Sequence, residues 1–296
     1  MAKVIHLKKG LDIKLKGAPL EIIGKATQSE LIGFVPEHFA GIIPKPVAKP
    51  GDKLKVGSVL FVDKNCPELR IVSPVSGELV AINRGERRKI LDIVIKNDFK
   101  MEQEIFPTID WKNASDKEVK QMLLSLGLFA FIKQRPYDIV ANPNDQPKAI
   151  FISTFDTAPL APDYTFILKD QVADFQAGIT ALSTLAPVSV GIKAGNGIFD
   201  GLKNATLHYF KGAHPAGNVG VQINNVNPVN KGEVVWTINP QEVLFIGRYV
   251  NKGTLDFSKL VASTGSEVTT PAYYPSIVGS PITPIVKANV SQGMSL

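Results

Sequence analysis

The chain has 296 residues, of which 44% are hydrophobic and 20% charged, so a disordered or fibrous protein is excluded. Lys and Arg outnumber Asp and Glu by 33 to 27, and the net charge of +6 suits anionic lipid headgroups or acidic partners as well as nucleic acid. The single cysteine, Cys66, excludes an intramolecular disulfide and cannot by itself build a cysteine-rich metal site. No apolar run approaches the roughly 20 residues that span a bilayer, and the N-terminus lacks the apolar block of a signal peptide. We therefore expect a cytosolic chain that is soluble when expressed alone and meets a membrane only peripherally.

Residues 1–100 are predicted to form a small all-β domain. Turn signals such as Pro50-Gly51-Asp52 and Arg84-Gly85-Glu86 recur about every ten residues, a rhythm typical of a sandwich or barrel. The short apolar segments between the turns are the expected strands: residues 4–7, 10–15, 20–23, 58–62, 71–72, 78–82 and 90–95.

Residues 101–148 are predicted to be a helical linker region. Ser115 and Glu118 have the spacing of a capping box, and apolar residues follow them at helical intervals. The polar, turn-rich residues 140–149 end this region.

Residues 149–258 alternate strand and helix patterns, which predicts a Rossmann-like α/β domain. The expected elements are a buried strand at 149–153, a helix capped by Asp170, a strand at 186–192, a short helix at 198–203, a strand at 205–210, and two strands within 234–250 that are joined at Asn239-Pro240. Residues 259–296 show no complete periodic element, so the chain is expected to end part-way into a further domain.

The turn pattern around Asp63 and Lys64 resembles the flattened barrel of lipoyl and biotinyl carrier domains. In such a carrier, a lysine at a hairpin tip receives the cofactor, and Lys64 falls close to that place. The residues that flank Lys64, among them Cys66 and Pro67, depart from the usual carrier sequence. A barrel used for structure or docking is therefore the first interpretation, and a modified Lys64 is the alternative.

A glycine-rich loop, with Gly195, Gly197 and Gly201, follows an expected strand and precedes an expected helix. Backbone amides at a helix N-terminus attract phosphate, so these three glycines are candidates for a nucleotide or phosphate site. The GxGxxxG spacing differs from the dinucleotide fingerprint, and Lys211-Gly212 stands where an acidic ribose ligand is expected. A tight structural turn is the commoner use of such a loop.

His214 follows the strand at 205–210, where ligand crevices of α/β sheets lie. Its imidazole could donate to a carbonyl oxygen, such as one on a quinone, although capping of local backbone is the commoner role. His38 has the same two interpretations. No catalytic residue and no metal site are predicted, and nucleic-acid binding is not expected because aromatic and basic residues do not interleave. The basic cluster Arg84, Arg87, Arg88 and Lys89 is either a solvated loop or a contact for phospholipid or an acidic partner protein.

Several segments, taken in order, resemble the A-subunit family of the Na⁺-translocating NADH:quinone oxidoreductase. They are residues 37–64 and 73–95, Arg135-Pro136-Tyr137, residues 150–163, Phe175-Gln176-Ala177-Gly178, His214-Pro215-Ala216-Gly217 and Ile246-Gly247-Arg248. The set spans nearly the whole chain. The C-subunit family of a related electron-transport complex shares the barrel but continues into cysteine motifs for iron–sulfur clusters, and this chain has none.

The resemblance implies a barrel-sandwich domain over 1–100, a Rossmann-like domain over 149–258 and the start of a soluble-ligand-binding β-grasp domain over 259–296, in a chain truncated before its C-terminal part. It also implies a peripheral subunit on the cytoplasmic face of the bacterial inner membrane, in a complex that oxidises NADH, reduces ubiquinone or menaquinone and exports Na⁺. The other subunits, above all a flavin-bearing membrane subunit, would be its partners and would carry FMN, FAD, riboflavin and iron–sulfur centres. This chain would hold no tightly bound cofactor, with quinone as a possible ligand near His214.

Two other functions remain open on the residues. One is a free-standing carrier modified at Lys64. The other is a soluble nucleotide-dependent reductase that uses the loop from Gly195 to Gly201.

Overall fold

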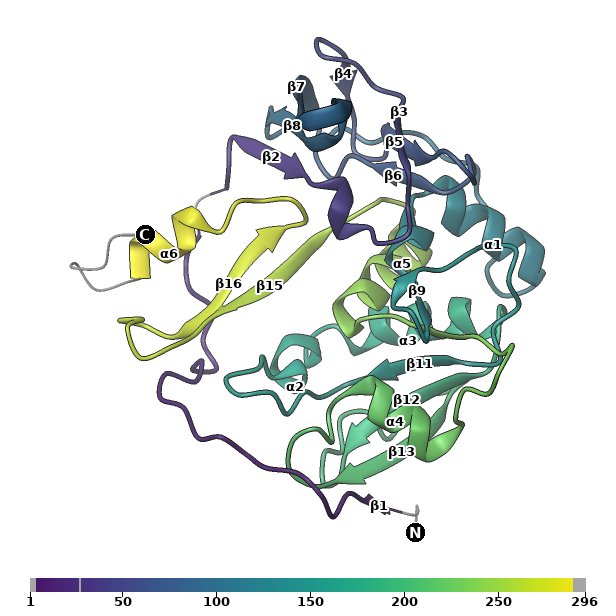
Figure 1. Cartoon of the computed structure of the whole chain (residues 1–296), viewed down its shortest axis with the longest axis vertical. Coiled ribbons are helices and arrows are strands. Elements are labelled where there is room, and N and C mark those ends of the chain that lie inside the picture. The colour runs from purple at the N-terminus through teal and green to yellow at the C-terminus, as the bar shows by residue number, and fades with distance from the viewer. Residues whose placement is uncertain (1–3, 27, 290–296) are drawn as a thin grey trace.

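We describe a computed structural model of the chain, in which residues 4–26 and 28–289 are placed. A β domain lies at one end of the molecule and an α/β domain at the other (Figure 1). A two-stranded sheet near the C-terminus lies beside both, and the N-terminal segment runs along the outer edge from the α/β domain to the β domain (Figure 1).

The β domain consists of two small antiparallel sheets. One has four strands in the order β2 (Leu31–Phe34), β8 (Ile90–Asn97), β7 (Gly77–Arg84) and β4 (Lys53–Leu54); the other has β3 (Pro44–Pro46), β5 (Val59–Asp63) and β6 (Arg70–Val72). Short 3₁₀ turns at Pro36–His38 and Glu86–Arg88 connect strands. A common core that includes Phe61, Leu79 and Ile93 fills the space between the sheets. The barrel-sandwich prediction is confirmed.

The α/β domain is built on one seven-stranded sheet. Its order is β1 (Val4–His6), β13 (Thr206–Lys211), β12 (Val188–Lys193), β11 (Ile150–Ser153), β14 (Val235–Thr237), β9 (Lys133–Arg135) and β10 (Ile139–Val140). The first five strands run parallel, and β9 and β10 are each antiparallel to their neighbour. The sheet is therefore mixed but mostly parallel, as expected for an α/β domain.

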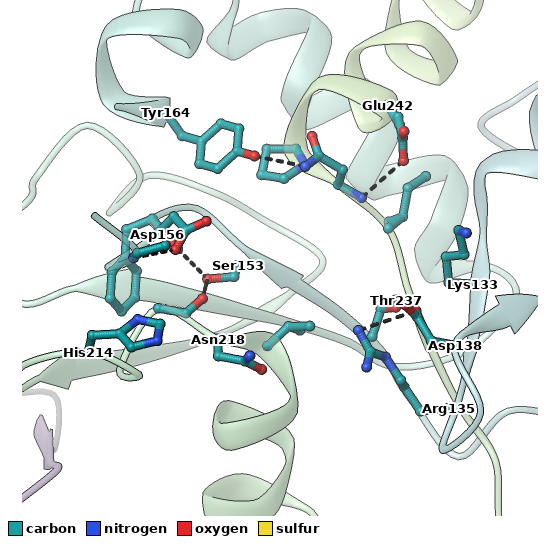
Figure 2. Close-up of a pocket in the computed structure, with 17 residues that line it drawn as sticks. Lys133, Arg135, Asp138, Ser153, Asp156, Tyr164, His214, Asn218, Thr237 and Glu242 are labelled. Atoms are coloured by element: carbon teal, nitrogen blue, oxygen red, sulfur yellow. Dashed lines mark hydrogen bonds and ion pairs between the residues drawn. The ribbon is translucent and has the colours of Figure 1, made fainter. Parts of the chain in front are cut away.

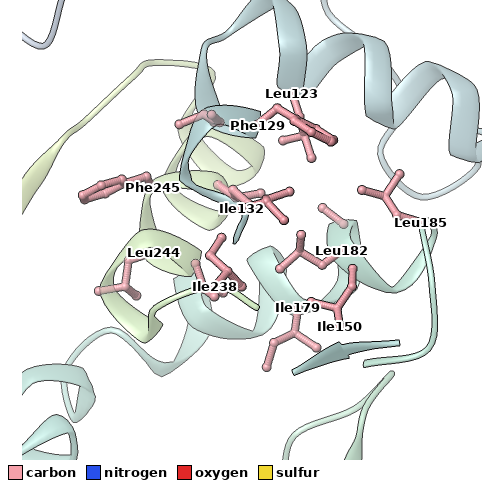
Figure 3. Packing of buried hydrophobic residues seen from close by; sticks show 14 of the residues in the cluster. Leu123, Phe129, Ile132, Ile150, Ile179, Leu182, Leu185, Ile238, Leu244 and Phe245 are labelled. Carbon is pink, nitrogen blue, oxygen red and sulfur yellow. The ribbon is translucent and has the colours of Figure 1, made fainter. Parts of the chain in front are cut away.

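Helices cover both faces of this sheet. Ile150 and Ile152 of β11 belong to the large core that contains α1 (Asp116–Ser125), the 3₁₀ turn Leu128–Phe131, α3 (Val172–Ser183) and α5 (Pro240–Lys252), part of which Figure 3 shows. Phe151 points the other way and packs with Ile223 of α4 (Val219–Val226). The short helix α2 (Tyr164–Leu168) lies between β11 and α3 in sequence.

The C-terminal part contains β15 (Ser258–Ser263), which pairs antiparallel with β16 (Ala272–Ile277), and then α6 (Thr283–Asn289). The expectation of no complete element over 259–296 is therefore wrong for its described part, and residues 290–296 lie outside the described residues. The β-grasp assignment of this segment stays a prediction. No helix in the described ranges is long and apolar enough to cross a bilayer.

The N-terminal segment corrects the predicted limits of the first domain. The strand expected near residues 4–7 exists as β1, but it pairs with β13 and so extends the α/β sheet. Residues 10–15 and 20–23 are not strands. Their backbones are instead tied at single points, such as the N–H of Leu11 on the carbonyl of His214 at 3.0 Å.

Three predictions within the α/β domain are also wrong. Residues 198–203 form turns rather than a helix. Asp170 does not cap α3, whose N-cap residue is Gln171 without a side-chain cap. The second strand expected within 234–250 is the helix α5, because Asn239 and Glu242 form a capping box there and Pro240 occupies the first turn. By contrast, the capping box predicted at Ser115 and Glu118 is present.

Candidate functional site

A cavity of about 480 Å³ lies at the point where the strand order of the sheet reverses. From β11 the chain proceeds to β12 and β13 on one side, and it returns through α4 to β14 on the other side of β11. Residues that follow β11 and β14 line the cavity, among them Phe155, Asp156 and Ile238. Open α/β sheets bind ligands in this crevice, outside the carboxyl ends of their strands. We call it the switch-point cavity (Figure 2).

Two helices begin at the cavity. Asn218 caps α4, and its side chain accepts from the N–H of Gly220 at 2.8 Å. Asn239 caps α5, accepts from the N–H of Gln241 at 3.0 Å and donates to the hydroxyl of Tyr164 at 2.8 Å. Both cap residues line the cavity, so the positive ends of two helix dipoles are directed toward it.

One wall of the cavity is formed by β9 and β14. Lys133 and Arg135 are two residues apart on β9 and therefore share a face, and Lys133 lies opposite Thr237 of β14. A terminal nitrogen of Arg135 pairs with Asp138 at 3.3 Å. Figure 2 shows Lys133, Arg135 and Asp138 together at one end, with Asp156 and His214 at the other. The sequence analysis did not select Lys133 or Arg135, because nothing local shows that β9 joins this sheet.

Glu242 is the titratable group in the cavity with the largest change. Burial raises its pKa to about 7, while Lys259 and Lys133 act in the opposite direction. Its carboxylate accepts from the backbone N–H of Asn239 at 3.4 Å. A side chain that is close to half ionised at neutral pH can take up or release a proton there. Its position in a capping box was the signal in the sequence that could have identified it.

His214 lines the opposite end of the cavity, as the sequence placed it. Its Nδ1 lies 3.2 Å from the hydroxyl of Thr157, and its backbone N–H donates to Asp12 at 2.8 Å. The Thr157 hydroxyl accepts from the N–H of Gly217 at 2.9 Å and so keeps its own proton available for Nδ1. With that proton on Nδ1, Nε2 carries a hydrogen and can donate to a carbonyl oxygen in the cavity.

The three glycines of the predicted phosphate loop do not form a helix N-terminus. Gly195 lines a separate cavity of about 480 Å³ together with His6 and Lys193. Gly197 and Gly201 lie in turns, with no helix after them. The local geometry therefore lacks the aligned amides on which the nucleotide hypothesis depended.

Lys64 lies in the turn between β5 and β6, and its residue is exposed. The neighbouring Asp63 is buried and accepts from the N–H of Ile43 at 3.0 Å, which fixes the start of the turn. The structure thus places Lys64 on a hairpin, as the alternative hypothesis of a carrier requires, and it does not test whether the lysine is modified.

His38 lies far from His214 in sequence but lines a smaller cavity, of about 250 Å³, that adjoins the first one. Glu242 and Lys133 line both cavities. In the basic cluster of the barrel, Lys89 pairs with Glu37 at 3.2 Å on the surface. Within residues 4–26 and 28–289, no three His, Cys, Asp or Glu side chains gather in a way that could hold a metal ion.

Models of known protein families match both halves of the chain. Residues 5–98 match the NqrA N-terminal barrel-sandwich hybrid domain, and residues 114–255 match the NqrA second alpha/beta domain.

Curated relatives agree with these matches, and three of them carry the name of the NqrA protein, the A component of a Na(+)-translocating NADH-quinone reductase. The one from Haemophilus influenzae (strain Rd) is 33% identical over 296 residues, which cover 98% of this chain and 66% of that protein. The one from Neisseria meningitidis (strain Z2491) is 33% identical over 287 residues, 95% of this chain and 64% of that protein. The one from Yersinia pestis (strain Angola) is 32% identical over 295 residues, 98% of this chain and 66% of that protein.

The fold defines a protein in which a barrel-sandwich hybrid domain precedes an α/β domain that has a crevice at its switch point. Two matched domain models in the same order specify the family more closely. The chain belongs to the NqrA family, the A subunits of Na⁺-translocating NADH-quinone reductases, and spans about two thirds of the length of the curated relatives it matches.

Proposed function

We propose that the chain acts as the peripheral cytoplasmic subunit of a bacterial membrane complex that oxidises NADH, reduces ubiquinone or menaquinone and exports Na⁺. The observation that supports this most directly is the match of both NqrA domain models, in order, along the chain. Its partners would be the other subunits of the complex, above all the membrane subunit that bears flavin.

We assign NADH oxidation to another subunit. The loop around Gly197 leads into turns, so this chain offers no glycine-rich helix N-terminus for a dinucleotide pyrophosphate. On this proposal the chain holds no tightly bound cofactor, and FMN, FAD, riboflavin and iron–sulfur centres belong to its partners. Its contribution is docking and, at the switch-point cavity, contact with quinone.

The switch-point cavity has the side chains that a quinone ring needs. Phe155 and Ile238 offer apolar surface, and Nε2 of His214 is free to donate to a ring carbonyl. Tyr164 accepts from Asn239 and retains a hydroxyl proton that it can donate. Glu242, with a pKa of about 7, is placed to supply a proton when a quinone is reduced by electrons from a partner's flavin.

The subunit role is tested by affinity purification of the tagged protein from membranes of its source organism, followed by identification of the proteins that accompany it. We expect the purified complex to contain the membrane subunit that bears flavin, together with an NADH-oxidising subunit. A chain recovered without partners, under conditions that preserve the complex, would contradict the proposal.

The quinone role is tested separately, by titrating the purified chain with a short-chain ubiquinone analogue and following heat or quenching of tryptophan fluorescence. We expect His214→Ala to weaken binding about tenfold, since it removes one buried hydrogen bond of about 1.4 kcal/mol. His6→Ala, outside this cavity, serves as the matched control and should bind as the unmodified chain does. Equal affinity of all three proteins would exclude His214 from the site.

The alternative of a free-standing carrier has one structural observation in its favour, the exposed position of Lys64 on a hairpin. Intact mass measurement of the protein from its source decides it. A mass increase of one lipoyl or biotinyl group, lost in Lys64→Arg, would support the carrier, and an unmodified mass would end that hypothesis.

A further inference from the structure

The N-terminal segment carries a concentration of exposed aliphatic side chains. Six large aliphatic residues lie within Leu11 to Ile23, with exposed fractions from 47% to 72%: Leu11, Ile13, Leu15, Leu20, Ile22 and Ile23. Single exposed apolar residues are ordinary, but a continuous run of them marks an interaction surface.

This segment is held against the molecule by its backbone, so its side chains cannot turn inward. The carbonyl of Gly17 accepts from the N–H of Gly265 at 3.0 Å, and the N–H of Leu20 donates to the carbonyl of Pro271 at 3.0 Å. The backbones are so close at Gly17 that a β-carbon there would lie 2.1 Å from the carbonyl oxygen of Gly265. The body of the protein therefore occupies the backbone side and leaves the aliphatic side chains facing outward.

Lysines are interleaved with these aliphatic residues. Lys8, Lys9, Lys14, Lys16 and Lys25 are all exposed. Within the described part of the chain none of the five forms an ion pair with a carboxylate. The acidic residues of the segment are Asp12, which accepts from the backbone of His214, and Glu21. The segment thus presents a positive, apolar surface.

The shape of this surface indicates the kind of partner. Figure 1 shows the segment as a strip along the outer edge of the molecule, from β1 past the lower end of β16 toward β2. A projecting strip suits a broad, flat partner, whereas a bound peptide would need a groove. Lysines attract anionic headgroups, and aliphatic side chains enter the boundary between headgroups and acyl chains.

We propose that residues 8–25 form a docking surface for a membrane that contains anionic lipid. Leu11, Ile13 and Leu15 insert between headgroups, and the lysines bind their phosphates. The inference goes beyond the proposed function and does not depend on it, because vesicle binding requires neither quinone nor another protein.

The test is co-sedimentation of the 296-residue chain with phosphatidylglycerol–phosphatidylcholine vesicles and with neutral phosphatidylcholine vesicles. We expect binding to the anionic vesicles that weakens as salt rises, and little binding to the neutral ones. Lys14→Glu combined with Lys16→Glu should lower the apparent affinity by roughly tenfold or more, since each basic residue near an anionic surface strengthens binding several-fold. These two side chains are exposed, so the variant keeps the fold.

Two further variants make the result specific. Leu11→Ser combined with Ile13→Ser should weaken binding at high salt as well, where the lysines no longer contribute. Lys112→Glu combined with Lys252→Glu changes the net charge equally on other surfaces and should leave binding unchanged. The proposal is overturned if anionic vesicles do not bind the chain, if both charge-reversal variants lose binding equally, or if Arg87→Glu combined with Arg88→Glu alone removes it. Binding to a partner protein without vesicle binding would assign the strip to a protein contact and would also overturn the proposal.

Discussion

Glu242 lies at the boundary between two cavities and lines both of them. The beginning of a helix favours an ionised carboxylate, and Lys133 and Lys259 add to that preference. Burial nevertheless dominates and raises the pKa to about 7. The carboxyl is therefore protonated at moderately acidic pH, and its ionisation near neutrality opposes folding.

This ionisation gives a prediction for stability against pH. A group whose folded pKa is raised stabilises the protein fully below its unfolded pKa, and that stability is lost as pH rises through the folded value. Glu242→Gln removes the ionisation and keeps a capping-box residue at the same place. We expect the variant to equal the unmodified chain near pH 4 and to exceed it by up to about 3 kcal/mol near pH 8, because each pKa unit corresponds to about 1.4 kcal/mol. Urea unfolding at the two pH values measures the difference, and a difference that does not change with pH would contradict the assignment.

The residues of the site show where sequence reasoning works and where it fails. His214 was placed correctly because it follows a strand whose carboxyl end must face the crevice. Lys133, Arg135 and Glu242 reach the same cavity from segments of chain that lie far apart in sequence. Only the pairing of β9 with β14 and the start of α5 bring them together, and no local pattern specifies either.

At the scale of elements, the close crossing of α3 and α5 shapes the core below the cavity. Gly178 and Gly247 allow the two backbones to touch there. A β-carbon on Gly247 would lie 1.6 Å from the carbonyl oxygen of Asp174, and one on Gly178 would lie 2.4 Å from the carbonyl oxygen of Val243. Since the opposing atoms belong to backbone, they cannot move aside without shifting a helix.

We therefore expect Gly247→Ala to lower the free energy of unfolding by about 3 kcal/mol, the upper part of the range for overpacked cores. Gly201→Ala is the matched control, because a β-carbon there has no heavy atom within 4 Å. It should change stability by less than about 0.5 kcal/mol. Thermal and urea unfolding of both variants make the comparison, and equal stability of the two would show that the helices cross less closely than described.

Elements with local signals were predicted well from the sequence. The box at Ser115 and Glu118 defines the start of α1, and uniform apolar runs identified β11 and β12. The failure at α5 arose from Val243 to Ile246, a continuous apolar run that suits a buried strand or a buried helix equally. The cap at Asn239 decides between them. The position of β1 could not be predicted, because its pairing with β13 joins residues about 200 apart.

At the scale of the molecule, the barrel and the α/β domain share one core. Val56, Leu69 and Val72 of the barrel belong to the same cluster of buried side chains as α3 and α5. The side chain of Gln103 joins the two parts, since it both donates to the carbonyl of Leu255 and accepts from its N–H, each at 3.1 Å. Surfaces matched in this way exclude water and couple the stability of the two domains.

The chain should consequently unfold in a single transition, in which amide exchange of β7 and β8 in the barrel follows the fluorescence of Trp111 and Trp236 in the α/β part. Gln103→Ala leaves the buried backbone of Leu255 without its partners, so we expect a loss of about 1–3 kcal/mol that both probes report equally. Gln121→Ala, at an exposed position on α1, should cost little. A barrel that melts earlier than the α/β part, in the unmodified chain or only in the Gln103 variant, would show that the shared core does not couple them. In that case the barrel would be a separable module, and a role confined to it, such as modification at Lys64, would gain support.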